Sequence, residues 1–456
     1  MNKRIIMLMA AALALLSAAG QVTFTGPFIE VTPESSTGLN KIYVVYDIQG
    51  VGMSIKSSGP TSWYSFDRRG AAYREPIAGV RWDGTTSTLD QVLQNSGTGY
   101  VIEGSLGTDS LYFWVVNYAD YMLELQGISV IEESPCDQIT FDIDGRGDAI
   151  PFHDINGGSR ELDRKMKLSY TTLEWDESNN RWDSKEVEVN LAGLNHVPTI
   201  APPLCNTVYT ISGDCFLEEW KQSGVGNGVQ RKTSDLYNTK AVESRVTYEQ
   251  KERDTDNELE KNLGSQLGGS APVHIVFTGH PTDAVDYSVW EIASDPNFEN
   301  VKYSAYDEEV LDYYFEDWGT WYVRYVVANK EANCEYYSEE TTFTVVVRES
   351  YLECPNFFSP GDGKGANDIW KVTFKSIVEF HCWIYNRWGN LVYEYDDVTG
   401  GWDGYYRGKL VDTGVYYYVV RAVGNDGEKW SPRGSITILR YGGGSPTPTG
   451  DGTAPN

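Results

Sequence analysis

Cysteine is scarce in this chain, which has six cysteines among 456 residues. That density is too low for a disulfide scaffold, and no C-x-x-C pair is present to indicate a zinc or redox motif. Two pairs, Cys205 with Cys215 and Cys334 with Cys354, are close enough in sequence for local bridges. The spacing does not decide whether each pair forms a disulfide bridge or stays as two free thiols, because a disulfide depends on the geometry of the two residues.

Positive charge is also scarce. The chain has 37 Lys and Arg against 65 Asp and Glu, a formal net charge of -28. Such a chain repels polyphosphates, which argues against nucleic acid as a partner. An acidic surface also favours solubility outside the cell, so we read it as solvated rather than as a site for a specific cation.

Recognisable catalytic motifs are lacking. There is no Gly-x-Ser-x-Gly turn, and no phosphate-binding glycine loop precedes a helix. A glycosidase would need two carboxylates about 5–10 Å apart, but a chain this acidic supplies candidate pairs by chance. We therefore predict no catalytic residue, no cofactor and no metal site. The five histidines are far apart and form no His-Glu-x-x-His motif: His153, His196, His274, His280 and His381.

The stretch DIDGRGD at residues 142–148 allows two further interpretations. Its three aspartates could ligate calcium, but the EF-hand order is not kept and no Glu closes the loop. Arg146-Gly147-Asp148 also matches an integrin tripeptide, which arises easily by chance in a chain rich in Asp and Gly. We favour a solvated turn over both interpretations. For Asp362 and Asp368 we likewise favour a turn over a calcium site.

One long apolar run is present, at the N-terminus. Lys3 and Arg4 precede the unbroken run Ile5–Leu16, and the small residues Ser17–Gly20 follow it. This order is typical of a secretory signal peptide, with cleavage expected before Gln21. No cysteine follows closely, so we do not expect a lipoprotein anchor, and no later run is long enough for a transmembrane helix.

Aromatic residues make up 13% of the chain and glycine is frequent, whereas helix-period apolar patterns are rare. This composition predicts mostly β structure, and the length predicts three or four domains. Residues 21–135 are expected to form an N-terminal β-sandwich domain. Its predicted strands, at 41–48, 99–104 and 110–118, are separated by Gly/Ser/Thr clusters.

Two further β domains are predicted, at 136–263 and 264–350. The first contains alternating stretches at 137–143, 164–175 and 185–193, a further strand entered through prolines at 202–214, and another at 241–250. The Gly-rich segment 262–272 is interpreted as a linker. In the second domain, residues 319–329 (GTWYVRYVVAN) alternate clearly between two faces, which predicts a strand. That stretch resembles the closing part of a PKD/immunoglobulin-like domain, although the family's Gly-Asp-Gly after its tryptophan is missing.

The region 351–440 has apolar residues on both faces of the stretch 380–385, which predicts a central strand. Gly389 permits a chain reversal, after which Leu391–Tyr395 would return as the partner strand. We expect Trp388 to fold back over this hairpin as a hydrophobic lid and Arg387 to pair with a carbonyl or carboxylate. Trp402 is expected to anchor a second turn.

Several motifs in this region occur in a characteristic order: FFSPGDGKGANDIW, YNRWGN, GWDGYYRGK, DTGVYYYVVRA and GSITILR. Together they resemble the gliding-motility-associated C-terminal domain, the type B sorting domain of the Bacteroidetes type IX secretion system, over residues 356–440. Two features depart from the family. Pro360 runs directly into Gly361-Asp362-Gly363 without the usual Asn, and sixteen residues follow Arg440. We expect the tail 441–456 to be disordered.

The resemblance implies export in two steps, first to the periplasm and then through the type IX translocon. It further implies an extracellular protein that is either attached to the outer membrane at the cell surface or released, and the family often has an outer-membrane β-barrel protein as a further partner. Trp, Tyr and Arg dominate interface hot spots, so the motif residues are candidates for recognition, while a role as core anchors is an equal alternative. They are Asn386, Arg387, Trp388, Gly389, Trp402, Asp403, Gly404, Gly414, Tyr416 and Tyr418.

The sequence thus predicts an all-β protein of tandem immunoglobulin-like sandwiches with a C-terminal β-sandwich sorting domain. Our leading hypothesis is a non-enzymatic surface protein whose first three domains serve adhesion, ligand binding or assembly with an outer-membrane complex. Two alternatives stay open: an extracellular hydrolase acting on glycan or protein, and a structural accessory of the secretion or gliding apparatus.

Overall fold

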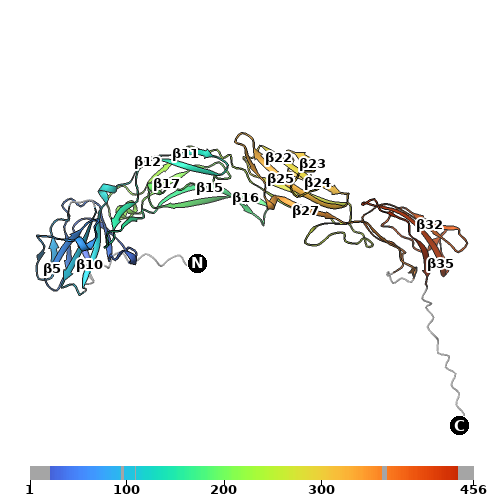
Figure 1. Ribbon diagram of the computed structural model, residues 1–456, viewed down its shortest axis with the longest axis horizontal. Coiled ribbons are helices and arrows are strands. Elements are labelled where there is room, and N and C mark those ends of the chain that lie inside the picture. Colours follow the sequence, from blue (N-terminus) through green and yellow to red (C-terminus); the bar gives the residue numbers. More distant parts are fainter. Residues whose placement is uncertain (1–20, 94–96, 108, 362–366, 440–456) are drawn as a thin grey trace, which may run out of the picture. The chain divides into compact units, whose positions relative to one another are not determined.

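The computed structural model describes residues 21–439 except 94–96, 108 and 362–366 (Figure 1). The predicted signal peptide and the tail 441–456 lie outside the described residues, as does most of the Gly361–Lys364 stretch. The described residues form 37 β-strands and one α-helix, α1 (Cys215–Gln222). The all-β prediction is therefore confirmed. No helix in the described part of the chain is long and apolar enough to cross a membrane.

The chain divides into two compact units, which are described separately. The first contains Met1–Glu174 and Asp183–Ala241, and the second contains Trp175–Trp182 and Val242–Asn456.

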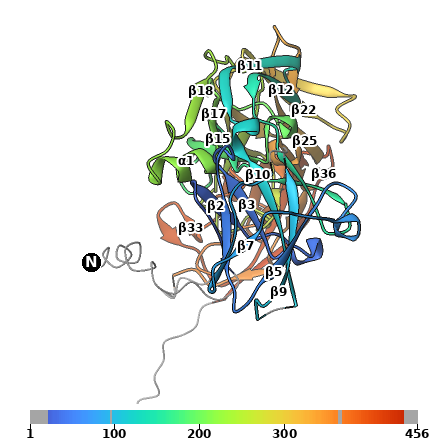
Figure 2. The same cartoon turned by 90° about the vertical axis from the view of Figure 1, so that its left-hand side faces the viewer.

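The first unit begins with a sandwich of two sheets. Its predicted strands at 41–48, 99–104 and 110–118 are confirmed as β3 (Lys41–Val45), β9 (Thr98–Gly104) and β10 (Ser110–Asn117). Figure 2 shows β3 and β10 side by side with β2 (Phe28–Val31). One sheet has the order β1 (Val22–Phe24), β4 (Met53–Lys56), β8 (Thr86–Leu89), β7 (Arg81–Trp82). The other has the order β2 (Phe28–Val31), β3 (Lys41–Val45), β10 (Ser110–Asn117), β9 (Thr98–Gly104), β5 (Thr61–Phe66), β6 (Glu75–Pro76).

Strand β3 is buried on both faces, which explains its continuous apolar run. Tyr43 points into the sandwich, where its ring meets Phe113 edge-on at 5.4 Å. Ile42 and Val44 point the other way, into a second core that includes Trp220 of α1. This second core joins the sandwich to the β region that follows it within the first unit.

That following region contains the strands predicted at 137–143, 164–175 and 185–193, which appear as β12 (Gln138–Arg146), β15 (Met166–Asp176) and β16 (Arg181–Leu191). Strand β17 covers only the end of the stretch predicted at 202–214. The pairs are β11 (Glu124–Ser134) with β12 (Gln138–Arg146), and β13 (Ile150–His153) with β14 (Ser159–Leu162). A four-stranded sheet has the order β16 (Arg181–Leu191), β15 (Met166–Asp176), β17 (Thr210–Gly213), β18 (Gln230–Thr233).

A buried charge pair stabilises this region. Arg164, which is 1% exposed, donates from Nε to Asp214 Oδ2 at 2.7 Å and from Nη2 to the carbonyl oxygen of Tyr121 at 2.8 Å. Asp214 also accepts a hydrogen bond from the Tyr118 hydroxyl at 3.2 Å and caps helix α1 through the Leu217 amide at 2.9 Å. One carboxylate therefore neutralises a buried guanidinium and also begins the helix.

In the second unit, a three-stranded sheet faces a larger one. The three strands are β19 (Ser244–Gln250), β21 (Val273–Pro281) and β24 (Val310–Phe315). The larger sheet has the order β20 (Leu267–Gly269), β27 (Thr342–Val347), β25 (Gly319–Asn329), β22 (Tyr287–Ala293), β23 (Val301–Tyr306), and β26 (Cys334–Tyr336) pairs with β25.

The alternation predicted for 319–329 is confirmed in β25. Val323, Tyr325 and Val327 are fully buried, and Tyr325 stacks on Trp290 of β22 at 4.3 Å. Strand β19 confirms the strand expected at 241–250, but it pairs with β21 along its whole length. Strand β19 therefore belongs to the same sheet as β21, and the predicted domain boundary at 263 wrongly separates the two strands.

The interpretation of 262–272 as a linker is wrong. Leu267–Gly269 forms strand β20, which pairs in parallel with β27. Gly268 has a φ of +125°, and a Cβ there would lie 2.0 Å from the carbonyl oxygen of Val346. Glycine is present here because two backbones approach closely, and not because the segment is flexible.

The C-terminal region, 351–438, is a second sandwich-like assembly. Strand β28 (Tyr351–Glu353) pairs with β30 (Thr373–Lys375), and a short hairpin joins β33 (Tyr405–Tyr406) to β34 (Lys409–Leu410). The main sheet has the order β29 (Phe357–Phe358), β37 (Arg433–Ile438), β35 (Gly414–Gly424), β31 (Ile377–Tyr385), β32 (Leu391–Tyr395), and β36 (Lys429–Trp430) pairs with β35. As predicted, β31 is a central strand.

Neither of the two local disulfides that the spacing allowed is formed. Cys215 begins helix α1 with a thiol, while the Cys205 sulfur donates to the carbonyl oxygen of Thr171 at 3.7 Å. Cys354 and Cys382 are also thiols, packed in the core of the C-terminal region. Each sulfur is held in its own packed surroundings, which sequence spacing does not reveal.

We predict that Asp214→Ala lowers the free energy of unfolding of the first unit by about 3–5 kcal/mol, because it leaves the buried Arg164 charge unpaired. Native-state hydrogen exchange of the full chain would measure the loss in peptides covering β15 and α1. Asp235→Ala, at an exposed position, is the matched control and should change stability by less than about 0.5 kcal/mol. Equal protection in both variants would contradict the role of the pair.

Candidate docking face on the C-terminal domain

The Asn-Arg-Trp-Gly motif forms the turn between β31 and β32. Asn386 Oδ1 accepts hydrogen bonds from the amides of Trp388 and Asn390, both at 3.0 Å. Gly389 has a φ of +79° and donates its amide to the carbonyl oxygen of Asn386 at 3.0 Å. Asn386 and Gly389 therefore shape the turn, as expected of an Asn side chain that accepts from its own backbone and a glycine that adopts positive φ.

The two large side chains of this turn face solvent. Trp388 is 71% exposed, and the guanidinium carbon of Arg387 lies 4.2 Å from the centre of its ring. The expectation that Trp388 folds back as a lid is wrong, and the expected polar partner of Arg387 is replaced by the indole ring. The tight turn projects both residues away from the sheet, where a cation–π contact is the nearest favourable interaction.

The Trp-Asp-Gly motif is structural. Trp402 is fully buried, donates from Nε1 to the carbonyl oxygen of Tyr405 at 3.1 Å, and exchanges two backbone hydrogen bonds with Trp370. Asp403 Oδ1 accepts from the Tyr405 amide at 3.0 Å. Gly404 has a φ of +79°, and a Cβ there would lie 2.7 Å from the ring of Pro360. These three residues hold the loop against the core.

The predicted residues of β35 also serve packing. Tyr418 is buried, with its ring 5.2 Å from Trp370. Tyr416 lies edge-on to Trp402 at 5.4 Å and donates its hydroxyl to the carbonyl oxygen of Asp412. Gly414 begins the strand with a φ of +144°. The structure therefore divides the predicted set: Arg387 and Trp388 are accessible, while Trp402 and Tyr418 are core residues.

Sequence reasoning missed the outer face of the same strand. Tyr417, Val419 and Arg421 alternate with the buried residues and are exposed, Tyr417 by 48%. On the neighbouring strand β31 they lie opposite Tyr385, Trp383 and His381, respectively. The period-two alternation within GVYYYVVRA could have revealed this face. We call these six residues the outer face.

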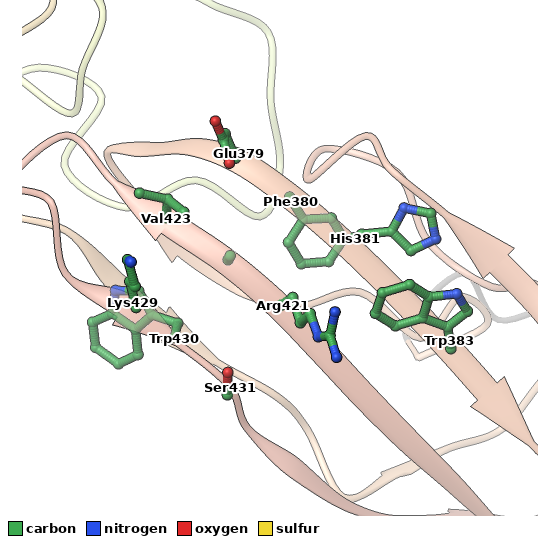
Figure 3. A pocket seen from close by; sticks show the side chains of 10 residues that line it. Glu379, Phe380, His381, Trp383, Arg421, Val423, Lys429, Trp430 and Ser431 are labelled. Atoms are coloured by element: carbon green, nitrogen blue, oxygen red, sulfur yellow. The ribbon is translucent and has the colours of Figure 1, made fainter.

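One end of the outer face is hollowed, with a volume of about 380 Å³. Figure 3 shows His381 and Trp383 on β31 next to Arg421 on β35. The rings of His381 and Trp383 are 4.1 Å apart, and the Arg421 guanidinium carbon is 5.7 Å from the Trp383 ring centre. The residues that line the hollow are Glu379, Phe380, His381, Trp383, Arg421, Ala422, Val423, Lys429, Trp430 and Ser431.

Aromatic rings and arginine are enriched at the hot spots of protein interfaces. His381 lies 3.7 Å from Glu394, a distance at which a protonated ring would form an ion pair. Burial raises the pKa of the Cys382 thiol to about 12 and that of Cys354 to about 11, so both sulfurs stay protonated and unreactive near neutral pH.

The other histidines lie apart in the fold, each with its own neighbour. His196 contacts Glu161 at 2.6 Å and His274 contacts Asp312 at 2.6 Å. Across the described ranges, no three His, Cys, Asp or Glu side chains are grouped so as to hold a metal ion. The solvated turn that we favoured for residues 142–148 is wrong for Asp142 and Asp144, which lie on strand β12.

Comparison with known protein families assigns the region that carries this face. Residues 352–438 match the CHU_C Type IX secretion signal domain. The C-terminal domain is a type IX secretion signal domain. The signal domain implies export across the outer membrane by the type IX secretion system, as its motifs suggested. Residues 129–227 match a fibronectin type III domain. The PKD/immunoglobulin-like assignment of 264–350 stays a prediction, and no curated protein matches the chain.

Three solved structures illustrate the similarity to other β proteins. A tetra-tandem repeat from the extending region of a large adhesion protein is 10% identical, with a TM-score of 0.20, and the match covers 86% of this chain and 96% of that one. Immunoglobulin domains 1–5 of Sidekick-1 are 9% identical, with a TM-score of 0.25 and coverages of 92% and 81%. A Ca²⁺-stabilised, ice-binding adhesin of an Antarctic bacterium is 12% identical, with a TM-score of 0.20 and coverages of 93% and 100%. TM-scores this low place no constraint on function.

We predict opposite effects for the two tryptophans of the signal domain. Trp402→Ala should destabilise the domain by about 3–5 kcal/mol through loss of a buried indole. Trp388→Ala should change its stability by less than about 0.5 kcal/mol, because the ring is already in water. Hydrogen exchange at β31 and β35 would measure both. A large loss of protection in Trp388→Ala would show that this residue is part of the core.

Proposed function

We propose that this chain is a non-enzymatic surface protein whose β domains serve adhesion, ligand binding or assembly with an outer-membrane complex. The observation that supports it most is the signal domain at 352–438, combined with an exposed arginine–tryptophan turn and an aromatic outer face. Export through the type IX system follows from the signal domain. Retention at the cell surface, and the identity of what is bound there, are part of the proposal.

The geometry supports docking of the signal domain to a protein partner in the translocon. The turn with Arg387 and Trp388 is braced by Asn386, and the outer face lies on a sheet whose other side is packed around Trp370 and Trp402. Such groups lose little conformational freedom on binding, so more of their contact energy becomes affinity. We propose that an outer-membrane β-barrel protein then holds the exported chain at the surface.

The character of the region before the signal domain supports binding rather than catalysis. Residues 21–350 contain 53 Asp and Glu against 25 Lys and Arg. Burial raises the pKa of the Cys215 thiol to about 12, which makes it a poor nucleophile. The acidic groups lie on strands and short turns, and many are paired with neighbouring Lys or Arg, such as Glu188 with Lys167 at 2.7 Å.

Deletion of residues 351–456 tests the export step. We expect the truncated chain to stay in the periplasm, because the signal domain is missing, while the full chain reaches the surface. Protease accessibility on whole cells, compared with lysed cells, would locate each product. Surface display of the truncated chain would refute the sorting role.

Two charge-reversal variants test the outer face. Arg421→Glu should lower the amount of exported chain about tenfold, which corresponds to the loss of one contact worth about 1.4 kcal/mol. Arg231→Glu, at an exposed position on β18 of the first unit, is the matched control and should leave export unchanged. Equal export of the two variants would contradict a role of the outer face in export. Quantitative immunoblotting of surface fractions gives the readout.

A further inference from the structure

A segment far upstream completes a sheet of the signal domain. Strand β30 pairs on one side with β28, and on its other side it meets residues 257–259. The Leu259 amide donates to the carbonyl oxygen of Phe374 at 2.8 Å, and the Phe374 amide donates to the carbonyl oxygen of Asn257 at 3.1 Å. We call residues 252–272 the clasp, because they lie between strands β19 and β21 and hold this edge.

The side chain of Asn257 satisfies two further carbonyl groups of the signal domain. Its Nδ2 donates to the carbonyl oxygens of Val372 at 2.8 Å and Val398 at 3.0 Å. These carbonyls belong to separate loops of the domain, so one amide group joins both loops to the clasp. An edge with unpaired backbone groups would otherwise be open to pairing with other chains.

A second contact joins the clasp to the residue after β30. The Ser376 amide donates to Ser270 Oγ at 2.8 Å, and the Ala271 amide donates to Ser376 Oγ at 2.9 Å. Ser270 and Ser376 are both fully buried. A reciprocal hydrogen-bonded pair without access to water is costly to break, because each group would be left unsatisfied.

The clasp also has contacts of its own and is joined to the preceding sandwich. Its Glu258 is buried and ion-pairs with Arg253, and the Thr255 hydroxyl donates to Glu258 at 2.7 Å. Burial raises the pKa of Glu258, but hydrogen bonds from Arg253, Ser270 and Thr255 outweigh it and hold that pKa below its ordinary value. The end of the clasp contains β20, which pairs with β27.

Charge complementarity follows the same contact. Lys371 pairs with Asp256 at 2.7 Å, and Lys375 pairs with Glu260 at 3.0 Å. Lys371 precedes β30 and Lys375 is its last residue, and both acids lie on the clasp. Ion pairs at a partly exposed position contribute little stability, so their effect here is mainly to set the register of the contact.

We propose that residues 257–259 of the clasp act as a donated strand, so that the signal domain reaches its export-competent form only when the preceding sandwich (244–347) has folded. The functional signal then begins at residue 252, a hundred residues before the part that matches the family. Folding of the neighbouring domain is thereby coupled to export. The inference rests on the proposed sorting function, but its structural part has a readout that does not involve export.

Asn257→Ala in the full chain tests the contact. We expect exchange of the β30 amides, followed by hydrogen-exchange mass spectrometry, to become at least about tenfold faster, because two carbonyls lose their donor. Asn262→Ala is the matched control, since Asn262 lies on the exposed part of the clasp and donates only to Glu252 there, at 2.8 Å. Unchanged exchange in Asn257→Ala overturns the inference.

A second pair of variants tests the coupling itself. Trp290→Ala, in the core of the preceding sandwich, should accelerate exchange in β30 as well as in its own strand β22. Trp63→Ala, equally buried in the N-terminal sandwich, should leave β30 unchanged. If Trp290→Ala accelerates β22 alone, the two domains fold independently and the proposal is wrong.

Surface display of the same variants separates the role of the clasp in export from its structural contact with β30. Reduced surface display of Asn257→Ala with normal display of Asn262→Ala supports the clasp as part of the signal. Faster exchange in β30 with undiminished display overturns the inference and leaves the sorting function intact. Continued display after deletion of 351–456 overturns the sorting function itself, so the two failures are distinguishable.

Discussion

Pairing of backbone groups at sheet edges is the constraint on which the second unit depends. A strand whose edge is open leaves a row of donors and acceptors without partners, and each must find protein or water. Strand β30 has one edge covered by β28 and the other by residues 257–259, which come from the preceding sandwich. The close approach of β20 to β27, made by glycines, positions the segment that supplies this cover.

Aromatic residues in the signal domain divide into two groups with different physical roles. Trp370 and Trp402 are fully buried and bond to each other through their backbones, so they determine how the loops pack. Trp388 is in water beside Arg387, on a turn that Asn386 holds in one conformation. A rigid interior and a braced, exposed aromatic turn together suit a domain that is recognised by another protein.

Much of the fold could be predicted from the sequence. Period-two alternation located the strand at 319–329, because that pattern depends only on which side of a pleat is buried. Continuous runs of aromatic and β-branched residues located the strands around 41–48 and 380–385, because such residues favour strands that are buried on both faces. Helix α1 was missed because it is only eight residues long and because its N-cap, Asp214, was included in the strand predicted at 202–214. Strand β20 was missed because Gly-rich composition is typical of linkers as well as of close backbone contacts.

The sequence by itself determined the β class, the acidic character and the identity of the signal domain, because strand periodicity, charge and motif order are local properties of the chain. Only the tertiary structure decided which motif residues are accessible and which are buried. It also decided that the Gly-rich stretch is a strand and that an upstream segment completes the signal domain. These depend on contacts between residues about a hundred positions apart, such as Asn257 with Val372, and a local pattern contains no information about such partners.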